Sequence, residues 1–229
     1  MPGSTPVLSF GNTSSAVIAT LGLNPSRQEF LDQHGRELTG NARRFETLTS
    51  LGVRDLATAS DAVLHRVANA CNGYFAANPY ARWFNQLEPV LRSVSASYYD
   101  GSACHLDLVQ WATDPVWSKI SDRAVRDRML AEDAAFLRQQ ITTGSFKLLL
   151  INGIGVVRQF ESVMGISLLP IDSIRGSSAE SRLLVGHLPI GTRVIAWSVN
   201  VQSSFGVCNT LRDRLARRVG ELGQDSAIA

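Results

Sequence analysis

The chain has 229 residues, of which 45% are hydrophobic and 18% are charged, and its formal net charge is +2. This apolar content is enough for a folded core and excludes a disordered or collagen-like chain. The apolar runs are far shorter than the roughly 20 residues of a membrane span, and the first residues lack the basic and apolar regions of a secretory signal. We expect one domain over residues 1–229, with flexible ends at 1–6 and 223–229, in a cytoplasmic protein that does not enter a membrane.

The cysteines and the basic residues limit the kinds of site and partner that the sequence predicts. The three cysteines, Cys71, Cys104 and Cys208, are odd in number and widely spaced, which suits neither a disulfide framework nor a zinc site and fits a reducing compartment. All but two of the 22 basic residues are arginines. Arginine binds phosphate well, but a coding bias toward arginine would produce the same excess. The charge therefore permits a nucleic-acid partner without requiring one.

Short apolar runs alternate with helical patterns along the chain. Strands are predicted at residues 16–23, 103–109, 146–152 and 193–198, with a possible edge strand at 182–186. Helices are predicted at residues 40–52, 57–70, 82–97 with a break or kink at Pro89, 121–142, 155–164, and around Leu211, Leu215 and Val219. This alternation is typical of a parallel sheet that is covered on both faces. The predicted fold class is therefore α/β, a three-layer α/β/α sandwich whose central, mostly parallel sheet has about four strands.

Ligands of such folds bind at the carboxyl ends of the strands. The four predicted strands are followed by polar or glycine-bearing segments at residues 21–26, 107–111, 152–155 and 198–206, which we expect to meet at one rim. These segments hold no cluster of His, Cys and carboxylate side chains, so they suit metal binding and covalent acyl chemistry poorly. They suit a polar, planar ligand or a phosphodiester better.

Each segment also has an ordinary structural explanation. Asn24 before a proline is a common turn residue, and Asp107 can cap a neighbouring N–H group. The run 152–155 resembles half of a dinucleotide fingerprint, but Arg158 stands where the third glycine belongs. Ser203 and its neighbour can begin the last helix, where free N–H groups also attract phosphate.

Two of these segments resemble the motifs of a known family. Gly22–Ser26 reads Gly-Leu-Asn-Pro-Ser and resembles motif A of the uracil-DNA glycosylase superfamily, nearest to the Gly-x-Asn-Pro form of its mismatch-specific and single-strand-selective branches. Asn200–Ser204 stands where the superfamily has its second motif, a His-Pro-Ser-Pro or Asn-Pro-Ser type of loop between a strand and a helix. Asp107 falls where several branches carry a base-reading Asn. The resemblance covers about residues 16 to 220.

The resemblance implies a cofactor-free, monomeric enzyme of base-excision repair. It would hydrolyse the N-glycosidic bond of a deaminated or damaged base in DNA, either uracil or a deaminated purine. By resemblance, Asn24 holds the attacking water and Asn200 donates to the base carbonyl that gains charge. The expected base contacts are Leu23, Phe30 (which would stack on the flipped base) and Asp107. The expected DNA contacts are Pro25, Ser26, Gln202, Ser203 and Ser204.

The sequence departs from the family pattern at several places. The second motif lacks the prolines, and Asn200 stands where many members have His. An ionised Asp107 only accepts hydrogen bonds and would repel a uracil carbonyl. Either Asp107 is protonated, or it does not read the base, or the substrate is not uracil. The remaining alternatives are a non-catalytic nucleic-acid-binding module on the same fold and a small-nucleotide-binding α/β protein that uses residues 152–155.

Overall fold

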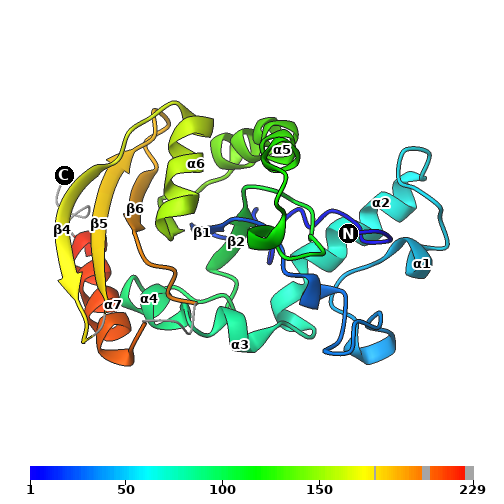
Figure 1. The fold of residues 1–229 in the computed structure, drawn as a ribbon, viewed down its shortest axis with the longest axis horizontal. Coiled ribbons are helices and arrows are strands. Elements are labelled where there is room, and N and C mark those ends of the chain that lie inside the picture. Colours follow the sequence, from blue (N-terminus) through cyan, green and yellow to red (C-terminus); the bar gives the residue numbers. More distant parts are fainter. Residues whose placement is uncertain (178, 203–206, 225–229) are drawn as a thin grey trace.

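A computed structural model describes residues 1–177, 179–202 and 207–224 (Figure 1). Its six-stranded sheet has the order β2-β1-β3-β6-β5-β4. The strands are β1 (Ile18–Gly22), β2 (Ala103–Asp107), β3 (Leu148–Asn152), β4 (Leu169–Arg175), β5 (Glu180–His187) and β6 (Arg193–Trp197). The helices are α1 (Leu48–Leu51), α2 (Asp61–Asn72), α3 (Ala81–Phe84), α4 (Glu88–Ser93), α5 (Arg123–Thr143), α6 (Ile154–Met164) and α7 (Asn209–Gln224).

The expected α/β class with a mostly parallel sheet is confirmed, but the expected number of about four strands is wrong. β2, β1, β3 and β6 are parallel, and β5 and β4 extend the sheet in antiparallel pairing. The predicted edge strand at 182–186 is part of β5, which lies inside the sheet, and β4 forms the edge. Sequence reasoning missed β4 because only Ile174 of this strand is buried, so it has no apolar run to reveal it.

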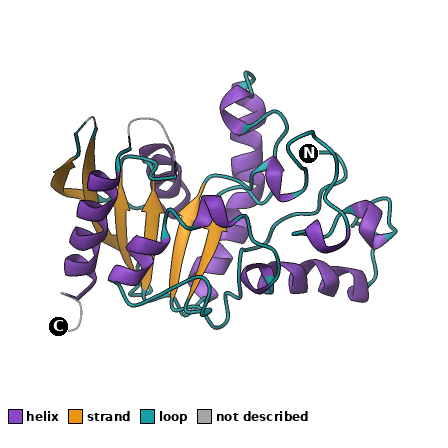
Figure 2. Cartoon of the chain, turned by 90° about the horizontal axis from the view of Figure 1, so that it is seen from below, coloured by secondary structure: helices purple, strands orange, loops and turns teal. Residues whose placement is uncertain are grey.

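Alternate side chains of the parallel strands enter two separate cores, as expected for strands with a period of two. On one face, residues such as Leu21, Leu106 and Ile151 pack against α5 and α6. On the other face, residues such as Ile18 and Trp197 pack against α2, α4 and α7. Figures 1 and 2 show helices on both sides of the sheet, which is the layered arrangement of an α/β sandwich.

The structure refines the predicted helices and corrects the expectation of a flexible first segment. Pro89 lies in the first turn of α4, where its missing N–H costs no helical hydrogen bond, so the predicted helix over 82–97 is split into α3 and α4. α5 is capped by Asp122, whose side chain accepts from the N–H of Ala124 at 2.8 Å. The segment 1–6, expected to be flexible, is packed, since Ser4 and Thr5 are buried. Of the expected flexible end at 223–229, residues 223 and 224 continue α7 and the rest lie outside the described residues.

Within the described parts of the chain, no helix is both long enough and apolar enough to span a bilayer.

Candidate functional site

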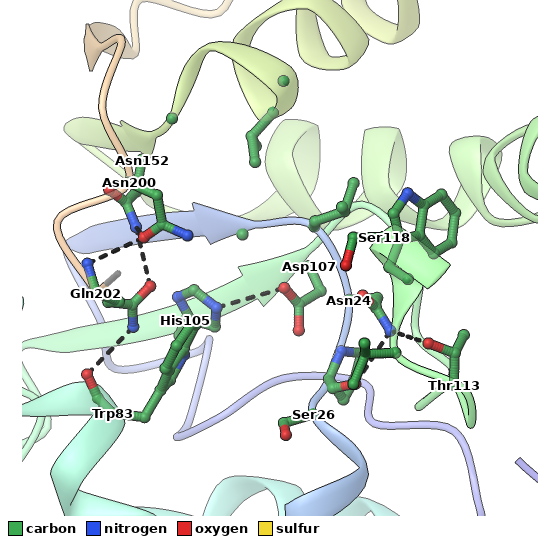
Figure 3. Close-up of a pocket in the computed structure, with 18 of the residues that line it drawn as sticks. Asn24, Ser26, Trp83, His105, Asp107, Thr113, Ser118, Asn152, Asn200 and Gln202 are labelled. Atoms are coloured by element: carbon green, nitrogen blue, oxygen red, sulfur yellow. Dashed lines mark hydrogen bonds and ion pairs between the residues drawn. The ribbon is translucent and has the colours of Figure 1, made fainter. Parts of the chain in front are cut away.

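A cavity of about 580 Å³ lies over the carboxyl ends of the four parallel strands. Its lining includes residues that follow each of them: Asn24 after β1, Asp107 at the end of β2, Asn152 at the end of β3 and Asn200 after β6 (Figure 3). The four segments therefore meet at one rim, as expected from the sheet. The volume lies within the range of pockets that hold small molecules or a single nucleobase.

The side-chain amide of Asn24 has a fixed orientation. Its Nδ2 donates to the carbonyl oxygens of Pro25 at 3.0 Å and Trp111 at 3.3 Å, and lies 3.2 Å from Thr113 Oγ1 (Figure 3). Carbonyl oxygens only accept, so the NH₂ group must face them. The opposite atom, Oδ1, receives no hydrogen bond from the described residues. Asn24 therefore presents an acceptor to the cavity.

Asn152 ties the second loop to the sheet. It is 4% exposed, and its Nδ2 donates to Asn200 Oδ1 and Gln202 Oε1, both at 2.9 Å. Its Oδ1 accepts from Trp197 Nε1 at 2.8 Å and from the backbone N–H of Val201 at 3.0 Å. All the usual hydrogen bonds of this amide are thus made within the protein, so Asn152 positions its neighbours.

The hydrogen bond from Asn152 fixes the Asn200 amide in the orientation opposite to that of the Asn24 amide. Asn200 Oδ1 accepts from Asn152 and from the N–H of Gln202 at 3.0 Å, which leaves the Asn200 NH₂ group without an acceptor among the described residues. Gln202, expected to contact DNA, lines the cavity and also bridges two elements, since its Nε2 donates to the carbonyl of Trp83 at 3.3 Å. The cavity is therefore lined by an amide acceptor from one loop and an amide donor from the other.

Asp107 ends a buried polar chain. It is 5% exposed, and its Oδ1 lies 3.4 Å from His105 Nε2. His105 Nδ1 lies 2.6 Å from Thr20 Oγ1, which lies 2.6 Å from Tyr98 Oη. In one consistent arrangement of the protons, Tyr98 donates to Thr20, Thr20 donates to His105 Nδ1, and the ring proton of His105 is on Nε2. Burial raises the pKa of Tyr98, which keeps the phenol neutral and able to donate.

The strand pairing brings this chain together. Thr20 of β1 is in register with His105 of β2, and Gly22 is in register with Asp107. His105 and Asp107 are two residues apart, so both point to the same face of the sheet. The sequence showed His105 only as an isolated histidine within a strand, because the register was unknown.

Gly22 leaves the space that Asp107 and His105 occupy. A Cβ atom at this position would lie 2.5 Å from Asp107 Oδ1 and 2.8 Å from His105 Nε2. We therefore expect Gly22→Ala to displace both side chains and to slow any reaction that depends on their positions by at least about 100-fold, since small displacements of reacting groups have effects of that size. Gly155→Ala, whose Cβ would meet no atom within 4 Å, is a control for folding only, because Gly155 also lines the cavity. Wild-type activity in Gly22→Ala would contradict this placement of Asp107 and His105.

Glu29 is a second carboxyl group in the cavity lining, which the sequence analysis missed. It is 1% exposed, and its Oε2 accepts from the Tyr74 hydroxyl at 2.7 Å. Burial raises the pKa of Glu29 to about 8 against the lowering effects of Tyr74 and Arg44. It lies in a short 3-10 turn, Arg27–Glu29, which Ser26 caps by accepting from the N–H of Gln28 at 3.2 Å. The only feature of the sequence that could have marked Glu29 as a site residue is its position shortly after the first motif.

The remaining expected residues divide between the cavity and the core. Leu23, Pro25 and Ser26 line the cavity. Phe30, expected to stack on a base, is instead a core residue that is 1% exposed and packs 5.8 Å from Phe45, ring centre to ring centre. The turn that directs Glu29 to the cavity places Phe30 in the core. The large aromatic side chains at the cavity are Phe10, Trp83, Phe84 and Trp117.

Of the two expected phosphate-binding features, Ser203 and Ser204 lie outside the described residues, and the turn at residues 152–155 differs from the prediction. The last helix, α7, begins at Asn209. At the start of α6, the N–H groups of Gly153 and Ile154 both donate to carbonyl oxygens of residues 197 and 198 at 2.9 Å. These N–H groups are therefore not available to a phosphate.

Among the described residues, no three His, Cys, Asp or Glu side chains are grouped so that they could bind a metal ion. No protein-family model and no curated protein matches this sequence.

Proposed function

We propose that this protein is a DNA glycosylase that hydrolyses the N-glycosidic bond of a deaminated or damaged base. The observation that carries the proposal is the opposite orientation of two asparagine amides, one near each end of the chain, at one cavity. Asn24 presents an acceptor and Asn200 presents a donor. Hydrolysis of this bond requires both, since a water must be held at the sugar carbon while negative charge develops on the departing base.

Asn24 and Asp107 act on the water. Water can donate one hydrogen bond to Asn24 Oδ1 and the other to the Asp107 carboxylate, which lies between His105 and Asn24 in the view of Figure 3. As the water oxygen bonds to C1′, Asp107 takes its proton. The bond between C1′ and the base nitrogen breaks, and its electron pair leaves with the base.

Asn200 acts on the base. Its NH₂ group is held by two hydrogen bonds at the opposite side of the amide, so no reorganisation is needed when charge develops on a base carbonyl. A fixed donor of this kind contributes about 3–4 kcal/mol to transition-state stabilisation. The base must first leave the stack, and Trp83 and Trp117 provide apolar walls for it in the cavity.

The small-nucleotide alternative is less well supported by the structure. It rested on residues 152–155 as a phosphate-binding turn, but Asn152 is fully used by its neighbours, and the N–H groups of Gly153 and Ile154 donate to protein carbonyls. The alternative of a non-catalytic binding module uses the same cavity. It differs from the enzyme only in that it would bind DNA without releasing a base.

Oligonucleotides with one uracil, hypoxanthine or xanthine test the proposal when they are incubated with the protein and then treated with alkali, which cleaves abasic sites. We expect the wild type to produce cleavage and Asn24→Ala to lose it by at least about 100-fold, because the water loses its acceptor. Asn41→Ala, an exposed asparagine outside the cavity, is the matched control and should cleave normally. A wild type that binds these oligonucleotides and releases no base would be the binding module instead.

A further inference from the structure

We propose that Glu29 is the general acid of this site and that its proton makes a deaminated purine, rather than uracil, the preferred substrate. This inference rests on the proposed function, and it names the class of base.

The hydrogen bonds of Glu29 direct a proton into the cavity. Tyr74 donates its hydroxyl proton to Oε2 and accepts from the N–H of Tyr80 at 2.8 Å, so this side of the carboxyl group is used. The other oxygen, Oε1, has no hydrogen-bond partner among the described residues. A proton on Oε1 is therefore free to be donated to a ligand in the cavity that Glu29 lines.

The surroundings of Glu29 favour the neutral acid. The groups that act on it are Tyr74 from the segment after α2, Arg44 from the loop before α1, and Asp107 from the end of β2. The Arg44 guanidinium donates to the backbone carbonyls of Gln28 and Asn78, and it makes no ion pair with Glu29. A carboxyl group that is 1% exposed and has no cation in contact pays a large desolvation penalty when it ionises. Burial accordingly raises its pKa to about 8, and the Asp107 charge acts in the same direction.

A proton donor at this place helps a purine more than it helps uracil. A purine carries a basic ring nitrogen, N7, and its protonation makes the base a better leaving group. Uracil has no such nitrogen and departs as an anion that is stabilised at a carbonyl oxygen. In the proposed step, Asp107 takes a proton from the water, the water oxygen bonds to C1′, and the electron pair of the broken bond goes to N9. Glu29 gives its proton to N7, so the base leaves neutral, and solvent then returns the proton from Asp107 to Glu29.

The two carboxyl groups thus have opposite tasks. Asp107 is close to His105, at 3.4 Å, and accepts a proton, whereas Glu29 has only neutral donors in contact and gives one. This assignment also resolves the conflict between an ionised Asp107 and a uracil carbonyl, because Asp107 acts on the water and does not read the base.

The test compares Glu29→Gln with the wild type on matched oligonucleotides that contain hypoxanthine or uracil, over pH 6 to 9.5. Glutamine keeps an acceptor for Tyr74 and has a similar shape, but it has no proton to transfer. We expect the wild type to release hypoxanthine faster than uracil, and its rate on hypoxanthine to fall as the pH rises above about 8. Glu29→Gln should lose at least about 100-fold on hypoxanthine, with no fall above pH 8, and less than about 10-fold on uracil. Glu132→Gln, on the exposed face of α5, is the control and should behave as the wild type.

Each other outcome overturns the inference in a recognisable way. Equal losses on both bases would make Glu29 a structural residue, and a wild type that prefers uracil would exclude the purine assignment while the proposed function stands. A wild type that releases neither base would overturn the proposed function together with this inference. If Glu29→Gln does not fold, the inference is still tested by the wild type, through the ratio of its release rates on hypoxanthine and uracil and through its pH profile.

Discussion

Asn152→Ala should lower the free energy of unfolding by about 2–5 kcal/mol and abolish base release. The substitution removes the partner of Trp197 Nε1 and of the Val201 N–H, and both residues are 0% exposed. Each buried donor that loses its acceptor lowers the free energy of unfolding by about 1–3 kcal/mol, and here two such donors lose theirs. The second loop also loses its tie to β3 through Asn200 and Gln202, so the Asn200 amide is no longer held with its donor toward the cavity.

Urea denaturation measures the stability effect, and the oligonucleotide assay measures the effect on activity. Asn69→Ala is the matched control, because Asn69 is an exposed residue of α2, and a change within about 0.5 kcal/mol is expected there. If Asn152→Ala had wild-type stability and released a base normally, Asn152 would not be the residue that positions the second loop.

The stability of the wild type should fall with rising pH because of Glu29. Its pKa is about 8 in the folded chain against an ordinary value of 4.5, so between these values the folded state binds more protons than the unfolded state. The free energy of unfolding therefore decreases from pH 4.5 to pH 8 and, for this group, changes little above pH 8. This difference between the two pKa values corresponds to on the order of 5 kcal/mol of unfolding free energy over the window.

The contribution of Glu29 is isolated by subtracting the pH dependence of Glu29→Gln, since every other titrating group is common to both proteins. We expect the stability of Glu29→Gln relative to the wild type to increase steadily between pH 4.5 and 8 in urea denaturation. Parallel curves for the two proteins over this range would show that Glu29 is ionised in the folded state at neutral pH, and the proposal of a proton donor would then be wrong.

The sequence predicted the parts of the fold that depend on local pattern. The buried runs at 146–152 and 193–198 gave β3 and β6 nearly to the residue, because apolar runs that end in polar residues have few other structures. β4 was missed because an exposed edge strand has no such run. The position of Pro89 was recognised as a break, but only the structure shows that it begins α4.

The candidate site was predictable only where a motif marks it. The strand-end rule identified Asn24, Asp107 and Asn200, and the structure places all three at one cavity. Their orientations depend on partners that are distant in sequence, such as Asn152 for Asn200, and no local pattern contains that information. Glu29 and Phe30 are neighbours in a turn, and the sequence alone did not indicate which of the two faces the cavity. Without the register of β1 and β2, His105 could not be linked to Asp107.

The central claim is that a base is released from DNA by the groups at this cavity, and mass spectrometry of the products tests it most directly. We expect incubation of the wild type with a hypoxanthine-containing oligonucleotide to yield free hypoxanthine and an equal amount of the abasic strand, with neither product from Asn24→Ala. An unchanged oligonucleotide after incubation with folded wild-type protein, for hypoxanthine, xanthine and uracil alike, would contradict the account.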